Sequence, residues 1–344
     1  MNILAYLFWN VVRTIPMLDK TWMWGKSHTP LPTLINLLCP YPTGIEVEVT
    51  TKCGLKCAMC EHTYWEEPSR DMSLEQFEYI IGQFPGLRWI GLTGIGEGSL
   101  HKDWNRMLEY LIDRGIKVEF FDTLNFVEKS DLRKWMSLGV DLWISLDAVT
   151  KDTYGKIRQG GDYLKVIQNA KTLFEYKGDK SSLWFHYIIS KPNINEVLQF
   201  IDLVNELRRG KDTLIQYTRV LHDFTEVKDL YVEIPDGLRR DVEEKGREKG
   251  IKIVWNANVP KRKPNISKCL EFFEPFIFVT GDVIPCCAGN EANGREYQKK
   301  TSLGNIFEKP FKEIWAGERY GQLRAMIRKG KLPSPCVNCP IYGK

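Results

Sequence analysis

The feature that most constrains the fold is an alternation of short β-branched or aromatic runs with amphipathic helical segments. Six runs predict strands at 45–49, 88–92, 116–121, 141–146, 183–189 and 213–219. Each strand with its helix takes roughly 25 to 45 residues, and a parallel pair needs a crossover of a dozen or more. The alternation therefore predicts an α/β chain with a parallel sheet, either a wound sheet or an open barrel.

Capping residues predict where several helices begin and end. Ser73 with Gln76 forms a capping-box pattern before an apolar periodic run, and Ser130 can cap a later helix. Three glycines lie where helices should stop: Gly115, Gly139 and Gly210. Beyond the sixth strand we expect a charged helix in "PDGLRRDVEEKGREKG", a strand in "IKIVW", two short strands around Gly281-Asp282 and a helix starting near Pro310.

Length and composition predict one large domain with an appendage. The chain has 344 residues, and its 48 basic and 44 acidic residues leave a net charge of +4. This balance provides no broad positive field for a polyanion, so we expect no nucleic-acid partner. Nine cysteines are too dilute for a disulfide scaffold, and no signal peptide is visible. We therefore predict a protein of the reducing cytoplasm.

The N-terminal segment, 1–43, is apolar and proline-rich. Its apolar start is too short to span a bilayer, which needs about 20 apolar residues. We expect an amphipathic helix that packs against the protein itself or a partner. The alternative is peripheral membrane contact through residues 1–26, although the polar face of the apolar start carries little besides Asn2, Asn10 and Arg13 and is not lysine-rich.

Three cysteines follow the first predicted strand within eight residues: Cys53, Cys57 and Cys60. They could belong to a zinc site, for which His62 is the nearest further ligand, but zinc usually takes a matching fourth cysteine or histidine. Iron–sulfur clusters also bind thiolates, and a cubane with three protein ligands keeps one iron open. The spacing leaves both kinds of site open.

The pattern Cys-x3-Cys-x2-Cys after a first strand resembles the radical SAM superfamily. In that family the open iron binds the amino and carboxylate groups of S-adenosylmethionine. The resemblance implies a [4Fe-4S] cluster on these cysteines. It also implies a partial (β/α)6 TIM-like barrel over residues 44–258.

Motifs after later strands extend the resemblance. "LTGIGEG" is similar to the family's Gly-Gly-Glu segment, although Ile95 occupies the second glycine position. "DTLN" and "ISLDAVTKDTYGKIRQGG" follow the third and fourth strands, where open α/β sheets bind ligands. The resemblance implies these cofactor-binding residues: Gly94, Gly96, Glu97, Asn125, Ser145 and Arg158. It places Asp147 at the edge of cofactor or substrate, as a candidate catalytic residue.

Two other polar positions have simpler interpretations. His186 alternates with apolar neighbours in the fifth strand, which favours a structural histidine over a catalytic one. Asn193 and Asn195 could form a turn or touch adenosine, and we expect the turn.

The segment 259–344 resembles the SPASM or shorter twitch extension of radical SAM enzymes. The resemblance implies a small α+β domain with one auxiliary [4Fe-4S] cluster on four thiolates: Cys269, Cys286, Cys336 and Cys339. Cys287 is expected to be a packed thiol, an alternative ligand, or a catalytic hydrogen-atom donor near the substrate. Cys39 is expected to be a small buried hydrophobic residue.

The resemblance implies an oxidoreductase, lyase or isomerase that cleaves S-adenosylmethionine to methionine and a 5′-deoxyadenosyl radical, which then takes a hydrogen atom from substrate. We expect a flavodoxin or ferredoxin as electron donor. The segment 1–43 does not resemble a leader-peptide recognition domain, which favours a small polar or carbohydrate-like metabolite as substrate, undergoing dehydrogenation, epimerisation or elimination. Peptide, lipid and glycolipid substrates remain alternatives. So does a non-catalytic iron–sulfur or zinc protein that transfers electrons or binds partners.

Overall fold

The fold is taken from a computed structural model that describes residues 39–222, 224–258, 265–287, 294–337, 339 and 342. These residues form two compact units. The larger unit holds the described residues of 47–77 and 89–259, and the smaller holds those of 39–46, 78–88 and 260–344. The helix expected within residues 1–26 lies outside the described residues.

The larger unit is built on parallel strands that occur in chain order across the sheet. The strands are β3 (Trp89–Leu92), β4 (Lys117–Asp122), β5 (Asp141–Ser145), β7 (Ser182–Ile189), β8 (Leu214–Arg219) and β9 (Lys252–Asn256). Every neighbouring pair is parallel. This order is that of a partial TIM-like barrel, and it confirms the predicted parallel sheet.

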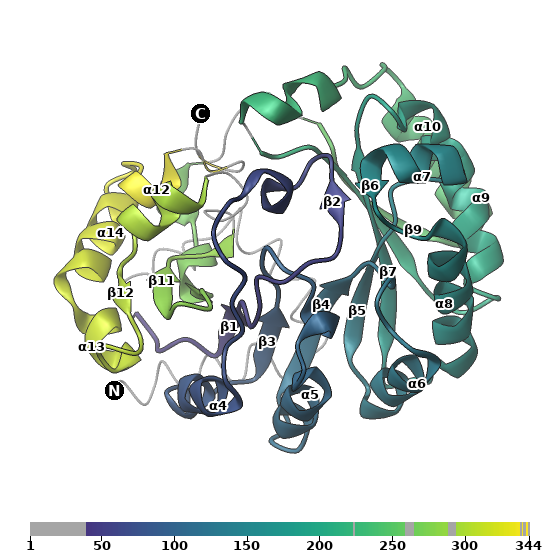
Figure 1. The fold of residues 1–344 in the computed structure, drawn as a ribbon. Helices are drawn as coiled ribbons and strands as arrows, with labels where there is room; N and C mark the ends of the chain where they lie inside the picture. Colours follow the sequence, from purple (N-terminus) through teal and green to yellow (C-terminus); the bar gives the residue numbers. More distant parts are fainter. Residues whose placement is uncertain are drawn as a thin grey trace. The chain divides into compact units, whose positions relative to one another are not determined.

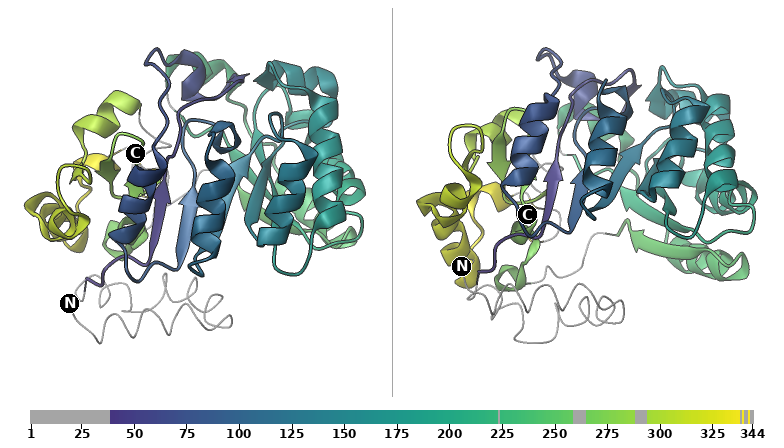
Figure 2. Two further views of the ribbon diagram at one scale, coloured as in Figure 1. Left: turned by 60° about the horizontal axis from the view of Figure 1, so that its bottom comes forward. Right: turned by 90° about the horizontal axis from the view of Figure 1, so that it is seen from below.

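Helices connect these strands and cover one side of the sheet (Figures 1 and 2). They are α5 (Trp104–Ile112), α6 (Lys129–Leu138), α7 (Lys151–Ile157), α8 (Tyr163–Tyr176), α9 (Val197–Leu207) and α10 (Leu238–Glu248). In β4, apolar Val118 and Phe120 are buried and alternate with the more exposed Lys117, Glu119 and Phe121. This period of two separates a core face from a second face of the sheet.

Aromatic side chains cross that second face. The strand register places Phe121 opposite Trp143 and Trp143 opposite Trp184. The ring centroids are 5.7 Å apart in the first pair and 4.7 Å apart in the second. Glu119 accepts hydrogen bonds from the indole nitrogens of Trp143, at 2.8 Å, and Trp89, at 3.4 Å. Phe121 stays 37% exposed, so this aromatic row presents a ring to solvent.

The predicted helix ends are mostly confirmed. The Ser73 amide donates to Gln76 Oε1 at 2.9 Å and the Gln76 amide donates to Ser73 Oγ at 3.1 Å, which completes the capping box before α4 (Leu74–Gly82). Gly139 ends α6 with a φ of 79°, and two other glycines also adopt positive φ: Gly115 and Gly210.

The prediction that Ser130 caps α6 is wrong. The N-cap is Glu128, whose side chain accepts from the amide of Asp131, while the Glu128 amide donates to Asp131 Oδ2 at 3.1 Å. The helix begins two residues earlier than expected, at Lys129 instead of Asp131. Ser130 therefore lies inside the first turn, where its hydroxyl cannot serve as the cap.

The smaller unit contains three short antiparallel strands: β10 (Phe276–Ile277), β11 (Asp282–Ile284) and β12 (Gly304–Asn305). Gly281 has a φ of 85° in the turn between the first two, as the sequence predicts. Its helices are α12 (Arg295–Lys300), α13 (Phe311–Ala316), which starts after Pro310, and α14 (Glu318–Arg328). In the described part of the chain, no helix combines the length and apolarity that a membrane span requires.

The revised cap of α6 gives a stability test. We expect Glu128→Ala to lower the free energy of unfolding by about 1 kcal/mol, because the amide of Asp131 loses its acceptor. Ser130→Ala, on the exposed side of the same turn, should change it by less than about half that amount. Urea unfolding followed by circular dichroism compares the two, and a larger loss for Ser130→Ala would restore the original assignment.

Candidate functional site

The three-cysteine loop is pinned by a short antiparallel pairing. β2 (Lys56–Cys57) pairs with β6 (Arg158–Gln159), and Cys57 lies directly opposite Arg158. The Ala58 amide also donates to the Ile157 carbonyl at 2.8 Å. These bonds attach the loop after the first strand to the segment that follows α7.

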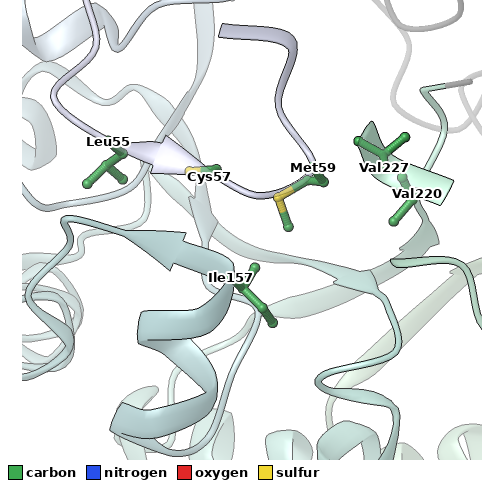
Figure 3. Packing of buried hydrophobic residues seen from close by; sticks show 6 residues of the cluster. All are labelled: Leu55, Cys57, Met59, Ile157, Val220 and Val227. Carbon is green, nitrogen blue, oxygen red and sulfur yellow. The ribbon is translucent and has the colours of Figure 1, made fainter. Parts of the chain in front are cut away.

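The three thiols gather at one apolar cluster. Cys57 is buried in it, and Cys53 and Cys60 pack against it. The other members of the cluster, shown with Cys57 in Figure 3, are Leu55, Met59, Ile157, Val220 and Val227. These apolar residues form a wall beside the three thiols, and an iron–sulfur cluster bound there would lie against this apolar wall.

The thiols are also close enough to affect one another's charge. Burial and then the Glu97 charge raise the pKa of Cys53 to about 12, with a further contribution from Cys57. Burial and then Cys57 raise the pKa of Cys60 to about 12, and Cys53 adds to it. Among the described residues, no three cysteine, histidine or acidic side chains converge on the position of a single ion. Three neighbouring soft donors fit a cluster of several irons.

His62, the nearest non-cysteine ligand considered from the sequence, is tied to the loop itself. Its Nε2 lies 3.1 Å from the Thr51 carbonyl oxygen, and the side chain is buried. Burial and then the charge of Lys56 lower the pKa of His62. The ring is therefore neutral at neutral pH and helps to hold the residues that precede Cys53.

The glycine-rich loop after β3 lies directly against the cysteine loop. The Glu97 amide donates to the Lys52 carbonyl at 2.7 Å. A Cβ on Gly96 would lie 2.5 Å from the Thr50 carbonyl oxygen, and one on Gly94 would lie 2.4 Å from Glu48 Cγ. Both glycines are thus required by close approach. The Ile95 amide donates to Glu48 Oε2 at 3.1 Å, so the non-glycine residue is accommodated in a fixed loop.

Glu97 has a defined orientation. Its Oε1 accepts from both the amide and the hydroxyl of Thr123, each at 2.7 Å, and the residue is buried. Burial and then the Glu97 charge raise the pKa of the adjacent Asp122 well above its usual range. Asp122 therefore favours its neutral form, and the pair carries less negative charge than two carboxylates. A carboxylate held in this way suits an ammonium partner.

Asn125 joins three segments around the third strand end. Its Nδ2 donates to the Tyr154 hydroxyl at 2.8 Å, and its Oδ1 accepts from the Asp162 amide at 2.8 Å. Ser145 ends β5 and lies opposite His186 in the register. The structure thus brings Asn125 and Ser145 to ends of neighbouring parallel strands, as predicted, and gives Asn125 a bracing role.

Asp147 and Arg158 form a buried ion pair. Arg158 Nε donates to Asp147 Oδ2 at 2.7 Å, and Asp147 Oδ1 accepts from the Ile188 amide at 2.7 Å. Burial alone would lower the pKa of Arg158, but Asp147 and Cys57 outweigh it and raise the value. Asn193, expected to shape a turn, does so: its Oδ1 accepts from the Ser190 amide, and its Nδ2 donates to the Asp147 carbonyl, both at 2.8 Å. In this arrangement Asp147 anchors Arg158.

His186 lies on the aromatic face of the sheet. Its Nε2 is 2.9 Å from Thr218 Oγ1, and its ring meets Phe121 edge-on at 5.5 Å. Burial lowers the pKa of His186 to about 4. The imidazole is neutral at neutral pH, in agreement with the expected structural histidine.

The C-terminal cysteines form a second group within the smaller unit. Cys336 and Cys339 are buried together, and Cys286 packs against them. Burial and Glu271 raise the pKa of Cys269, and the charges of Cys336 and Cys339 add to the rise. The four thiols are therefore neighbours, which fits a fully ligated cluster.

The two remaining cysteines lie elsewhere. Cys287 packs against a different apolar group, made of Phe276, Phe278 and Ile284, as expected for a packed thiol. Cys39 is only partly buried, which contradicts the expectation of a buried residue, and it adopts a φ of 46°.

Sequence patterns did not assign a supporting role to Glu48 and Thr123, which hold the glycine loop and Glu97. They pointed to Asn193 as a turn residue but not to its hydrogen bond with Asp147. The available signal was an acid in the predicted strand 45–49: Glu48, in the run "IEVEVT", is 1% exposed in the structure, and a buried acid needs partners.

Family models identify both parts of the chain. The model of the radical SAM superfamily matches residues 47–204, and that of the SPASM iron–sulfur cluster-binding domain matches residues 269–340. The chain belongs to the radical SAM superfamily. It is an enzyme of that superfamily, and its cofactors are iron–sulfur clusters and S-adenosylmethionine.

Curated relatives of this radical SAM enzyme differ in what they act on. The tungsten-containing aldehyde ferredoxin oxidoreductase cofactor-modifying protein of Pyrococcus furiosus is 26% identical and covers 86% of each chain. The antilisterial bacteriocin subtilosin biosynthesis protein AlbA of Bacillus subtilis is 24% identical, over 80% of this chain and 60% of AlbA.

Solved structures share the fold. Streptococcus suis SuiB bound to S-adenosylmethionine has a TM-score of 0.66 and 15% identity, over 88% of this chain and 76% of SuiB. The enzyme anSMEcpe with bound AdoMet has a TM-score of 0.62 and 14% identity, over 83% of this chain and 81% of that one.

The close approach at Gly96 gives a test of the site. We expect Gly96→Ala to lose most of the iron bound at the cysteine loop, because the new methyl group displaces the backbone of Thr50 to Lys52. Gly155→Ala is the control, since a Cβ there meets nothing within 4 Å. Iron and sulfide per chain after anaerobic reconstitution compare the two. Full iron binding by Gly96→Ala would show that the loop tolerates a different path.

Proposed function

We propose that Cys53, Cys57 and Cys60 hold the [4Fe-4S] cluster at which this enzyme binds and reductively cleaves S-adenosylmethionine. The observation that carries the proposal is the contact between the cysteine loop and the glycine loop. The Glu97 amide bonds to Lys52, next to Cys53, while the Glu97 carboxylate is fixed by Thr123. A cluster and an acid for the cofactor's ammonium group would thus lie side by side.

Other residues would complete the cofactor site. The glycine loop, through Gly94 and Gly96, would bring its backbone close to the methionine part of the cofactor. Ser145 lies at the end of β5, where its hydroxyl could donate a hydrogen bond to a ribose or carboxylate oxygen. Asn125 would contribute by holding Tyr154 and Asp162 in place beside the site.

When bound and reduced, the cluster and S-adenosylmethionine supply a 5′-deoxyadenosyl radical that takes a hydrogen atom from the substrate. The chain's own contribution is to bind both partners and to keep water and reactive side chains away. The apolar wall around Cys57 suits this task, because its members Met59 and Val227 are buried.

We propose one auxiliary [4Fe-4S] cluster on Cys269, Cys286, Cys336 and Cys339. Tyr342 lies near this group, since burial and then the charges of Cys269, Glu271, Cys339 and Cys286 raise the pKa of its hydroxyl. With four thiolate ligands such a cluster has no open iron for substrate. Its role would be to accept or relay an electron or to stabilise the smaller unit, and Cys287 would be no ligand.

For the substrate, we propose a small polar or carbohydrate-like molecule bound at the aromatic row. The exposed ring of Phe121, stacked on Trp143, offers an apolar face, and Glu119 offers a hydrogen-bond acceptor nearby. Aromatic faces with a few placed polar groups are typical of small-molecule sites. The relative from P. furiosus, named as a cofactor-modifying protein, supports a small molecule.

A peptide substrate is the second candidate. The relative AlbA is named for biosynthesis of a bacteriocin, and SuiB has been solved with its precursor peptide. An aromatic row could also stack against peptide side chains. Further parts of the proposal rest on the sequence alone. They are a lipid or glycolipid as another candidate substrate, peripheral membrane contact through residues 1–26, a cytoplasmic location, and a flavodoxin or ferredoxin as electron donor.

The first test of this function needs no substrate. After anaerobic reconstitution and reduction with dithionite, we expect the wild type to convert S-adenosylmethionine to 5′-deoxyadenosine, measured by mass spectrometry. Cys57→Ala should abolish this product, because the cluster loses one of three protein ligands. Cys39→Ala should retain it, since Cys39 belongs to neither thiol group. Absence of 5′-deoxyadenosine from an iron-loaded wild type would refute the proposal.

The second test concerns the auxiliary cluster. The wild type should bind about eight irons, as two [4Fe-4S] units. Cys339→Ala should reduce this to about four while reductive cleavage of S-adenosylmethionine continues. Cys287→Ala should keep about eight. If Cys287→Ala loses iron and Cys339→Ala does not, the assignment of the ligands is wrong.

A further inference from the structure

We infer that Arg158 acts on the proposed S-adenosylmethionine-binding cluster through one of its ligands, as a positioning residue. Its guanidinium donates a charged hydrogen bond to the Cys57 sulfur and thereby raises the reduction potential of the cluster. The inference rests on the proposed assignment of Cys57 as a ligand. It differs from the expected direct contact between Arg158 and S-adenosylmethionine.

The pairing of β2 with β6 places Arg158 beside Cys57. Arg158 and Cys57 are register partners in the pairing of β2 with β6, so their side chains leave the two backbones side by side. Arg158 Nη1 lies 3.8 Å from Cys57 Sγ, within the range of a hydrogen bond to sulfur. The contact joins residues 101 positions apart, and the antiparallel pairing fixes it.

Asp147 fixes the rest of the Arg158 guanidinium group. Arg158 Nε and Nη2 both bind Asp147 Oδ2, at 2.7 and 2.5 Å. Asp147 is itself held by the Ile188 amide and by the Asn193 side chain. Each of the three guanidinium nitrogens thus has a partner, and the one that remains for the thiol loop is Nη1.

Burial strengthens the electrostatic effect of Arg158 on a neighbouring cluster. Arg158 is 7% exposed and Asp147 is 0% exposed, so water screens their charges little. Arginine stays protonated in proteins, and its cation stabilises any added negative charge beside it. A cluster that takes up one electron gains one negative charge. Hydrogen bonds to cluster sulfurs and nearby charge are established determinants of cluster potentials.

Among the residues that the structure describes, no charged side chain donates a hydrogen bond to Cys53 or Cys60. The Leu55 amide donates to Cys53 Sγ at 3.5 Å, which is a neutral hydrogen bond. Charged donors form hydrogen bonds about twice as strong as neutral ones. Among the described contacts of the three thiols, Arg158 is therefore expected to have the largest effect on the reduced cluster.

The test is a redox titration of the full-length holoprotein followed by electron paramagnetic resonance, without S-adenosylmethionine. The relevant cluster is recognised in a parallel sample as the one whose signal changes when S-adenosylmethionine is added. We expect Arg158→Met to shift the midpoint potential of this cluster to a lower value. Arg158→Lys keeps the positive charge but loses the planar guanidinium group with its several donors, and it should shift the midpoint potential less. Arg106→Met, at an exposed arginine paired with Asp103, should leave it unchanged.

Arg158→Met leaves Asp147 buried without its cation and could fail to fold. The double variant Asp147→Asn, Arg158→Met removes both charges and keeps the side-chain volumes similar. Because Arg158 is the member of the pair that contacts Cys57, this variant should also titrate at a lower potential. Iron content and circular dichroism equal to those of the wild type establish that the variants retain the cluster and the fold.

The outcomes separate this inference from the proposed function. An iron-loaded wild type without any signal that responds to S-adenosylmethionine overturns both. A responsive wild-type cluster whose potential is unchanged in the iron-replete variants overturns the inference alone. If those variants keep the potential but bind S-adenosylmethionine more weakly, Arg158 is a cofactor contact and not a residue that tunes the cluster.

Discussion

The site depends on one buried ion pair, that between Asp147 and Arg158. Asp147 is attached to β7 through the Ile188 amide, and Arg158 is attached to the cysteine loop through its pairing with Cys57. The pair therefore connects the end of the parallel sheet to the loop that carries the thiols. Removing one partner of a buried pair commonly costs about 3–5 kcal/mol, because the other charge remains buried. Such a cost opposes any rearrangement that separates Asp147 from Arg158.

Close packing of backbone complements this electrostatic link. The glycine loop reaches the cysteine loop because Gly94 and Gly96 have no side chains at the points of contact. Thr123, from the next strand end, then orients Glu97. Each interaction joins neighbouring strand ends, which meet at one edge of a parallel sheet. A site of this kind can be rigid although it is made of loops.

Much of the fold followed from periodicity and capping. The parallel strands β4, β5, β7 and β8 lie within two residues of their predicted positions, because strands buried by helices need continuous or alternating apolar runs. The Ser73–Gln76 capping box formed as predicted, since both partners lie within one turn. Ser130 failed as a cap because two acids, Glu128 and Asp131, form a capping box that starts the helix two residues earlier. Where two nearby residues could each serve as the N-cap, the sequence pattern alone does not decide between them.

The sequence by itself determined the type of chemistry: three cysteines at fixed spacing after a first strand, a glycine-acid loop after the second, and five more cysteines near the C-terminus, four of them candidate ligands. Tertiary structure decided which side chains face one another. Asp147 and Arg158 both lie in one recognisable motif, yet their partners Ile188 and Cys57 are distant in the chain. Spacing along a chain specifies side-chain types and local turns. Contacts across a sheet depend on register and on close approach of loops, which arise only when the strands have assembled.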